Sequence, residues 1–254
     1  MRKEERLAVI LQKLREDGYV KSNELSKLFN ISEMTIWRDL DELEKLGCLK
    51  KVFGGAVDIK GTYDESPINE RVFENTSAKE NIAAYAISLL KTNDRVFLDS
   101  GSTCYIIARN LVNIDKRLFC STNALNTAVE LSKNNEIKTI VIGGELKGKS
   151  MCCIGPSAEA QIKAYSFSVS FVACNGIDID GNVMLLDLGE RGFKRDIIET
   201  SDKCYLVCDS LKIGKTSMVS LTDVSKFTGI ITDKGLDPKI KKTLEGKGAR
   251  FILA

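Results

Sequence analysis

The sequence contains no histidine and only three prolines and one tryptophan in 254 residues. Histidine is a common metal ligand and a common acid–base group near neutral pH, so its absence weakens both a zinc site and one class of enzyme chemistry. Eight cysteines are present, but no two of them form a Cys-x-x-Cys pair, and most stand among apolar residues. This pattern predicts reduced thiols in a core, with neither a metal nor another cofactor.

Long apolar runs are also absent. No stretch approaches the roughly 20 apolar residues that cross a bilayer, and the charged residues 1–6 lack the apolar core of a signal peptide. We therefore expect a cytoplasmic protein without a membrane partner. The 37 basic and 35 acidic residues nearly balance, so any attraction to nucleic acid must come from local placement of charge. The chain is long enough for two domains.

Residues 22–56 have the pattern of a helix, a tight turn, a second helix and a basic strand. Ser22 and Ser32 stand where N-caps are preferred, each just before an apolar pattern of helical spacing. In the second helix the apolar residues share one face: Ile36, Leu40, Leu43 and Leu46. Gly54-Gly55 permits the bend of a hairpin. With an amphipathic helix at about 5–16, the stretch predicts a winged helix-turn-helix.

The exposed start of the second helix and the strand after it carry the candidate DNA contacts. Donors, hydroxyls and a flat ring can meet base edges, whereas lysines and close backbone approach suit phosphates. The candidates are Ser32, Met34, Thr35, Trp37, Arg38, Lys50, Lys51, Gly54 and Gly55. On the residues alone, a helical hairpin used for dimerisation or protein contact stays open as the alternative.

A second domain follows a polar stretch in which the helical periodicity fades. We predict a DNA-binding domain at 1–57, a linker at 58–76 and a second domain at 77–254, opened by a capping box at 77–80. Apolar runs alternate there with helical patterns, which predicts a doubly wound, mostly parallel α/β sheet. The expected strands are 95–98, 118–120, 139–142, 169–173, 204–207 and 229–232.

Small and polar residues follow nearly every expected strand. Ligands of open α/β sheets bind beyond the carboxyl ends of the strands, and residues 99–103, which lead into a helix, suit a phosphate or another anion. Turn chemistry explains any one of these groups alone. Together they form a candidate effector site: Asp99, Ser100, Gly101, Ser102, Thr103, Thr122, Asn123, Gly143, Gly144, Gly176, Lys194 and Lys212.

Two groups of motifs closely resemble the DeoR family of bacterial transcriptional regulators, and together they cover nearly the whole chain. The first is residues 32–47 with Phe53-Gly54-Gly55-Ala56; the second is 99–103, 122–123, 143–144, 176–178, 194–195 and 209–214. Trp37 and Phe53 stand where the family usually has an arginine and a histidine, and Cys104 replaces a hydroxyl residue. The resemblance implies a winged helix-turn-helix followed by a sensor domain similar to ribose-phosphate isomerases, which binds phosphorylated sugars or related metabolites.

The resemblance therefore implies a DNA-binding transcriptional regulator, expected to be a repressor, that responds to a phosphorylated sugar or related metabolite. Symmetric half-sites in double-stranded operator DNA imply a homo-oligomer, either a dimer or a tetramer. The alternative is a sugar-phosphate isomerase-like enzyme with an appended helical module, in which Asp99, Asp178, Glu190 or Asp209 supplies the base. Because a winged helix has no task in such an enzyme, we expect no catalytic activity.

Overall fold

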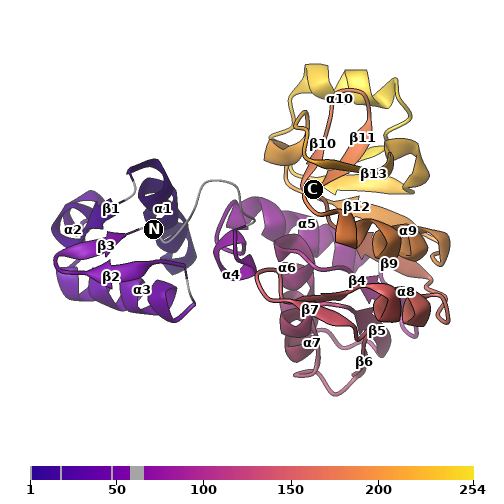
Figure 1. The fold of residues 1–254 in the computed structure, drawn as a ribbon, viewed down its shortest axis with the longest axis horizontal. Helices are drawn as coiled ribbons and strands as arrows, with labels where there is room; N and C mark the ends of the chain where they lie inside the picture. The colour runs from indigo at the N-terminus through magenta and orange to yellow at the C-terminus, as the bar shows by residue number, and fades with distance from the viewer. Residues whose placement is uncertain (1, 18, 47, 58–65) are drawn as a thin grey trace. The chain divides into compact units, whose positions relative to one another are not determined.

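The structure is a computed structural model that describes residues 2–17, 19–46, 48–57 and 66–254. The chain divides into two compact units, residues 1–76 and 77–254 (Figure 1). Each unit has its own apolar core and is described separately below.

The first unit is a winged helix-turn-helix, which confirms the predicted class. A three-stranded antiparallel sheet of order β1-β3-β2 lies beside three helices. The elements are α1 (Lys3–Asp17), β1 (Tyr19–Lys21), α2 (Ser22–Phe29), α3 (Glu33–Lys45), β2 (Lys50–Val52) and β3 (Gly55–Val57). A short further helix, α4 (Ile68–Arg71), follows the wing.

Local sequence explains where α2 and α3 meet. Asn30 ends α2 in the left-handed conformation, with φ of 53°, which asparagine tolerates better than most residues. Ser32 caps α3, because its side-chain oxygen accepts a hydrogen bond from the Thr35 N–H at 3.3 Å. The predicted cap at Ser22 is wrong: Ser22 is the first residue of α2, and no side chain caps that helix. Gly47, the expected end of α3, lies outside the described residues.

A buried ion pair joins α1 to α3. Asp39 is almost fully buried, and the Arg6 guanidinium donates to both of its carboxylate oxygens, at 2.6 and 3.0 Å. Leucines and isoleucines of both helices form the core of the unit, and Trp37 is half-buried against this cluster. The geometry is bidentate, which is the strongest arrangement for such a pair.

Part of the predicted linker is folded. Residues 58–65 lie outside the described residues, but 66–76 belong to the first unit. Ile68 and Val72 are buried, Phe73 packs against the first unit's core, and the Asn69 amide donates to the Leu46 carbonyl oxygen at 3.2 Å. Although most residues of this stretch are polar, these three apolar side chains connect it to the first unit. The exact limits 1–57 and 77–254 stay a prediction.

The second unit is built on a seven-stranded parallel sheet, which confirms the predicted fold class. The strand order is β15-β14-β12-β9-β4-β5-β6, and every neighbouring pair is parallel. The strands are β4 (Arg95–Leu98), β5 (Leu118–Thr122), β6 (Ile137–Val141), β9 (Val169–Val172), β12 (Cys204–Val207), β14 (Gly229–Thr232) and β15 (Phe251–Leu253). All but β15 were expected from the sequence.

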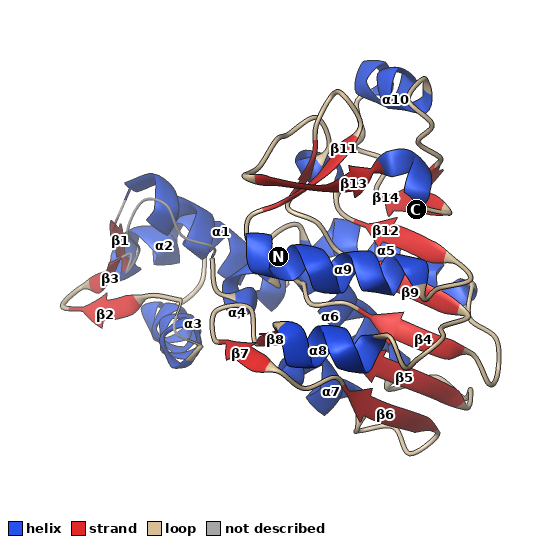
Figure 2. Ribbon diagram, turned by 45° about the vertical axis from the view of Figure 1, so that its right-hand side comes forward, coloured by secondary structure: helices blue, strands red, loops and turns tan. Residues whose placement is uncertain are grey.

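Helices cover both faces of this sheet. Figure 2 shows α8 (Pro156–Ile162) and α9 (Arg191–Glu199) in front of it, and α5 (Thr76–Ser88), α6 (Ser102–Leu111) and α7 (Leu125–Leu131) behind it. A last helix, α10 (Pro238–Glu245), precedes β15. The arrangement matches the alternation of strand and helix in the sequence, which places the connections on both sides of a parallel sheet.

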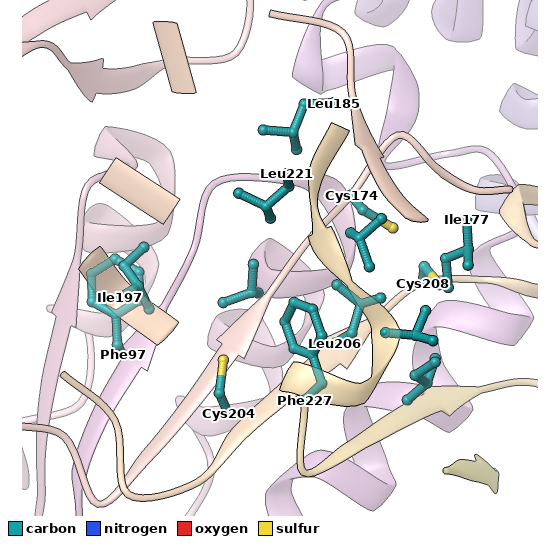
Figure 3. Packing of buried hydrophobic residues seen from close by; sticks show 14 of the residues in the cluster. Phe97, Cys174, Ile177, Leu185, Ile197, Cys204, Leu206, Cys208, Leu221 and Phe227 are labelled. Atoms are coloured by element: carbon teal, nitrogen blue, oxygen red, sulfur yellow. The ribbon is translucent and has the colours of Figure 1, made fainter. Parts of the chain in front are cut away.

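Two smaller sheets were not expected. A hairpin joins β7 (Glu145–Lys147) to β8 (Cys152–Ile154), and an antiparallel sheet contains β10 (Gly176–Ile177), β11 (Asn182–Leu185) and β13 (Val219–Asp223). Figure 3 shows Leu185 and Leu221 of the antiparallel sheet in one cluster with Leu206 of the main sheet and Ile197 of α9. The small sheet therefore shares the core of the second unit.

All eight cysteines are buried and outside any disulfide, as the apolar surroundings predicted. Burial raises the pKa of the Cys120 thiol to about 12, which keeps it protonated. Among the described residues, no group of three or more potential ligands could hold a metal ion. No helix in the same part of the chain is long and apolar enough to span a membrane.

The Arg6–Asp39 pair predicts a large stability effect. Replacing Arg6 with alanine leaves a buried carboxylate without its partner, which should lower the free energy of unfolding of the first unit by about 3 kcal/mol. Trp37 is the only tryptophan and packs on this unit's core, so its fluorescence during denaturant unfolding reports this unit selectively.

The matched control is Lys3→Ala, because Lys3 and Glu42 form a more exposed ion pair between the same two helices. Exposed pairs contribute at most about 1 kcal/mol, so this variant should unfold nearly as the unaltered protein does. Equal unfolding curves for Arg6→Ala and Lys3→Ala would show that the buried pair does not stabilise the unit.

Candidate functional site

The exposed start of α3 gathers most of the predicted base contacts. Ile36, Leu40 and Leu43 are fully buried and fix the helix against the core. The opposite face presents Ser32, Met34 and Arg38 to solvent, with Thr35 half-buried beside them. Helix α3 therefore holds a guanidinium, two hydroxyls and an apolar thioether on one rigid face, which suits base edges in a major groove.

Two predicted contacts already have partners inside the first unit. Trp37 is half-buried against the core, so only part of its ring remains for DNA. The Lys51 ammonium pairs with Asp41 and lies 3.5 Å from Glu44 Oε2, and the hydrogen bond to Asp41 raises the pKa of Lys51. Its charge is thus balanced before DNA binds, whereas Lys50, one position earlier, is exposed.

The wing is connected to α3 through the buried hydroxyl of Ser22, a residue that was predicted to cap α2. Ser22 N–H donates to the Gly54 carbonyl oxygen at 2.9 Å, and the Ser22 hydroxyl lies 3.3 Å from the same oxygen. The hydroxyl also contacts Glu33 Oε2 at 3.2 Å, at the start of α3. Ser22 therefore fixes the wing turn relative to the helix that would enter the groove.

Backbone geometry explains why both wing positions, Gly54 and Gly55, are glycine. Gly54 adopts φ of 81°, a conformation that other residues rarely take. A Cβ on Gly55 would lie 1.8 Å from the Val20 carbonyl oxygen, because β1 and β3 approach closely there. Their placement in the wing fits the predicted contact with phosphates, but local geometry alone already requires glycine.

In the second unit, the strand order creates a switch point between β4 and β9. The chain moves outward from β4 through β5 to β6, and then returns to β9 and continues in the opposite direction. Ligands of such sheets bind in the crevice beyond the strand ends at this point. Residues Asp99–Thr103 follow β4 and residues Ala173–Asn175 follow β9, so the predicted loop lies at the switch point.

Asp99 connects the two strand ends. Its carboxylate is fully buried, with Oδ2 accepting from the Ala173 N–H at 2.9 Å and Oδ1 accepting from the Ser100 N–H at 2.8 Å. The Lys194 ammonium of α9 lies 2.5 Å from Asp99 Oδ2 and donates to the Ala173 carbonyl oxygen at 3.1 Å. Both predicted residues thus meet at the crevice, but each already has the other as a partner.

The ion pair continues as an alternating row of charges. Glu190 Oε2 lies 3.5 Å from Lys194, and its Oε1 lies 2.9 Å from the Lys147 ammonium. Asp187 Oδ2 follows, 3.0 Å from Lys147. Burial lowers the pKa of Lys194, but the charges of Asp99 and Glu190 outweigh it and raise that pKa above its usual value. Burial likewise raises the pKa of Glu190, but the two lysines outweigh it and lower that pKa.

The loop after β4 leads directly into the start of α6. Gly101 has φ of 138°, and a Cβ there would lie 2.8 Å from the Ala173 side chain, so only glycine allows this approach to β9. The hydroxyls of Ser102 and Thr103 are buried at the helix start, where no side chain caps the free N–H groups. These groups and the positive end of the helix dipole can hold an anion.

Cys104, which replaces a hydroxyl residue, turns toward the core. Its thiol lies 3.5 Å from the Phe171 carbonyl oxygen, and burial raises its pKa far above the usual range. The thiol is therefore neutral and contributes no charge to the loop.

Asn123 at the end of β5 keeps one free acceptor. Its amide nitrogen donates to the Cys153 carbonyl oxygen at 3.0 Å, which fixes the orientation of the amide group. The other atom, Oδ1, is buried and has no hydrogen-bond partner among the described residues. A buried carbonyl oxygen without a donor is costly, so this position suits a hydroxyl group of a bound molecule. Thr122 is internally bonded, since its hydroxyl accepts from the Ala124 N–H at 3.1 Å.

The remaining predicted residues lie at other strand ends. Gly143 exchanges two hydrogen bonds of 3.2 Å with the Gln161 side chain. Gly144 and Gly176 allow close packing, because a Cβ would lie 2.5 Å from the Ile154 oxygen and 2.4 Å from the Lys215 oxygen respectively. Lys212 donates to the Cys174 carbonyl oxygen at 3.1 Å, next to the switch point. Lys147 was missed, since nothing in the sequence predicted the β7–β8 hairpin that carries it.

Comparison with known proteins finds a match for each of the two units. Residues 6–62 match the DeoR-like helix-turn-helix domain, and residues 74–234 match the DeoR C-terminal sensor domain. The chain is 36% identical to the uncharacterized HTH-type transcriptional regulator YulB of Bacillus subtilis, over 96% of this chain and 93% of that protein. It is 31% identical to the glycerol-3-phosphate regulon repressor of Escherichia coli, over 92% of each protein.

Another relative is the L-fucose operon activator of Haemophilus influenzae, 33% identical over 96% of this chain and 98% of that protein. Among solved structures, ribose 5-phosphate isomerase A of Methanocaldococcus jannaschii is 15% identical, covers 55% of each chain and has a TM-score of 0.41. The matching domains and the named relatives are those of transcriptional regulators. The chain therefore belongs to the DeoR family of DNA-binding transcriptional regulators and is not an enzyme.

Proposed function

We propose that this regulator represses operons by binding operator DNA through α3 and the wing, and that a phosphorylated sugar or related metabolite at the β4–β9 switch point controls that binding. The observation that carries the proposal is the group of buried polar side chains that follow β4 and β5, Asp99, Ser102, Thr103 and Asn123, which lies where open α/β sheets bind ligands. It lies in the unit that matches the sensor domain.

The crevice offers complementary groups for the two halves of such a metabolite. A phosphate suits the free N–H groups at the start of α6 together with the hydroxyls of Ser102 and Thr103. A sugar hydroxyl suits the unpaired Oδ1 of Asn123. Lys194 holds Asp99 in position, since the two are already paired. The name of the glycerol-3-phosphate regulon repressor supports a phosphorylated three-carbon or longer polyol as the class of effector.

Control of DNA binding follows from linkage. An effector weakens operator binding only if it binds more tightly to an arrangement that does not fit DNA. In a symmetric homo-oligomer, that arrangement is one in which two copies of α3 no longer match half-sites about one helical turn apart. We therefore propose a dimer or tetramer that works in the cytoplasm. The named relatives include both a repressor and an activator. Whether the effector weakens or strengthens operator binding therefore depends on which arrangement of the oligomer it binds more tightly.

Arg38 provides the first test. Arg38→Ala should weaken specific operator binding by about 1–3 kcal/mol if its guanidinium reads a guanine, and it should leave thermal shifts with effector unchanged. Gel-shift titration with an operator selected from random duplexes measures the first effect. Lys239→Ala removes an exposed charge from α10 in the other unit and is the matched control; equal affinity of all three proteins would remove Arg38 from the interface.

Asn123 and Ser102 provide the second test. Asn123→Ala and Ser102→Ala should bind operator normally but respond weakly to effector, because each removes one group that meets the ligand. A thermal-shift screen of pentose, hexose and glycerol phosphates identifies the effector, since a ligand at 100 times its dissociation constant stabilises the protein by about 2.7 kcal/mol.

Ser157→Ala, on the exposed side of α8, is the control for that experiment. Lys194→Ala is unsuitable, because it leaves Asp99 buried without a partner and should destabilise the whole unit. Full effector response in both crevice variants would show that the ligand binds elsewhere.

A further inference from the structure

The tip of the wing carries a fully exposed aromatic side chain. Phe53 has a relative exposure of 104%, the highest among the large apolar residues that the structure describes. It stands in the turn between β2 and β3, beside the paired residues Val52 and Gly55. A phenylalanine left entirely in water gains free energy from any contact that covers it, so the wing presents an apolar group that nothing in the first unit covers.

The turn holds Phe53 in a defined place. Gly54 takes the positive φ that a tight turn requires. The Gly54 carbonyl oxygen accepts a hydrogen bond from the Ser22 N–H at 2.9 Å, and the next residue, Gly55, is paired with Lys21 in the β1–β3 ladder. A side chain on such an anchored turn loses little conformational freedom on binding, which favours its use as a contact.

The turn that carries Phe53 lies near the start of α3. The Ser22 hydroxyl contacts both the wing turn, at the Gly54 oxygen, and the start of α3, at Glu33. The wing tip and the exposed start of α3 are thereby fixed next to each other. The chain belongs to a DNA-binding family, in which α3 would enter the major groove. An apolar wing tip beside α3 would then lie over the adjacent minor groove.

The charges near Phe53 favour DNA over another apolar partner. Lys50 is exposed three residues before it, and Lys21 is paired with Gly55 in the β1–β3 ladder. Lys21 contacts Glu24 at 2.8 Å, but both side chains are more than half exposed, so this bond exchanges readily for a phosphate. An apolar tip on the sheet whose strands β1 and β2 carry these two lysines matches a minor groove, whose phosphate walls enclose sugar rings and base edges.

We propose that Phe53 enters the minor groove of the operator as an apolar contact, packs against deoxyribose and a base step, and thereby adds a preference for easily deformed steps at that position. Flexible pyrimidine–purine steps open at lower cost than others, so the preference arises without a hydrogen bond to a base. The proposal goes beyond DNA binding as such and rests on it.

The test compares Phe53→Ala with Lys50→Ala on one duplex, selected from a random-sequence library by the unaltered full chain. Phe53→Ala should lower affinity about 10- to 100-fold, the range for burial of one large apolar side chain. Its plot of log affinity against log salt should keep the slope of the unaltered protein, because an apolar contact releases no counterions. Lys50→Ala should instead reduce that slope by about 1.

Two further measurements keep the outcome clear. Phe53→Leu should retain most of the affinity, and a repeated selection with Phe53→Ala should lose base preference at the step under the wing. Trp37 fluorescence should show the same unfolding midpoint for Phe53→Ala as for the unaltered protein, since the exposed ring adds nothing to the core.

Wild-type affinity in Phe53→Ala would overturn the proposal, and so would a fall in affinity accompanied by a smaller salt slope, which would mean that charged wing contacts were lost instead. If the unaltered protein selected no sequence at all, DNA binding itself would fail, and that result is distinguishable from failure of the Phe53 contact alone.

Discussion

Lys194 lies in the interior of the sensor unit between Asp99 and Glu190, and this arrangement determines much of what surrounds it. A buried ammonium group requires opposite charges close by, because the loss of hydration is otherwise too costly. The pair joins α9 to the end of β4, while the second Asp99 contact joins β4 to β9 through the Ala173 N–H. The same bonds that stabilise the switch point therefore shape the crevice proposed for the effector.

The first unit uses the same kind of contact for a different purpose. The Arg6–Asp39 ion pair connects α1 to α3, and the Ser22 hydroxyl connects the wing to the start of α3. With both contacts in place, α3 and the wing form one rigid surface. A rigid surface favours DNA binding, because side chains that are already held in position lose less conformational entropy when they contact DNA.

Much of the fold could be predicted from the sequence, because its strands are buried on both faces and appear as continuous apolar runs. The short strands β7, β8 and β10 carry too few residues to show a pattern, and α4 was hidden in a polar stretch. Asp99 was expected just after a strand and Lys194 on a later helix, but their mutual pairing depends on a contact between residues 95 positions apart in the chain, which periodicity does not contain. Ser22 was misassigned for a similar reason: its partners, Glu33 and Gly54, are neighbours only in three dimensions.

The neutralisation of Lys194 has a consequence for selectivity in a cell, where inorganic anions are abundant. A lysine whose charge is already cancelled by two carboxylates gives small anions little net attraction, so they have little reason to accumulate in the crevice. In the proposed site, recognition would then depend on groups with directional hydrogen bonds, such as backbone N–H groups and the unpaired Oδ1 of Asn123. The proposed site should therefore bind free phosphate weakly and favour a molecule that offers a hydroxyl at a suitable distance from its phosphate.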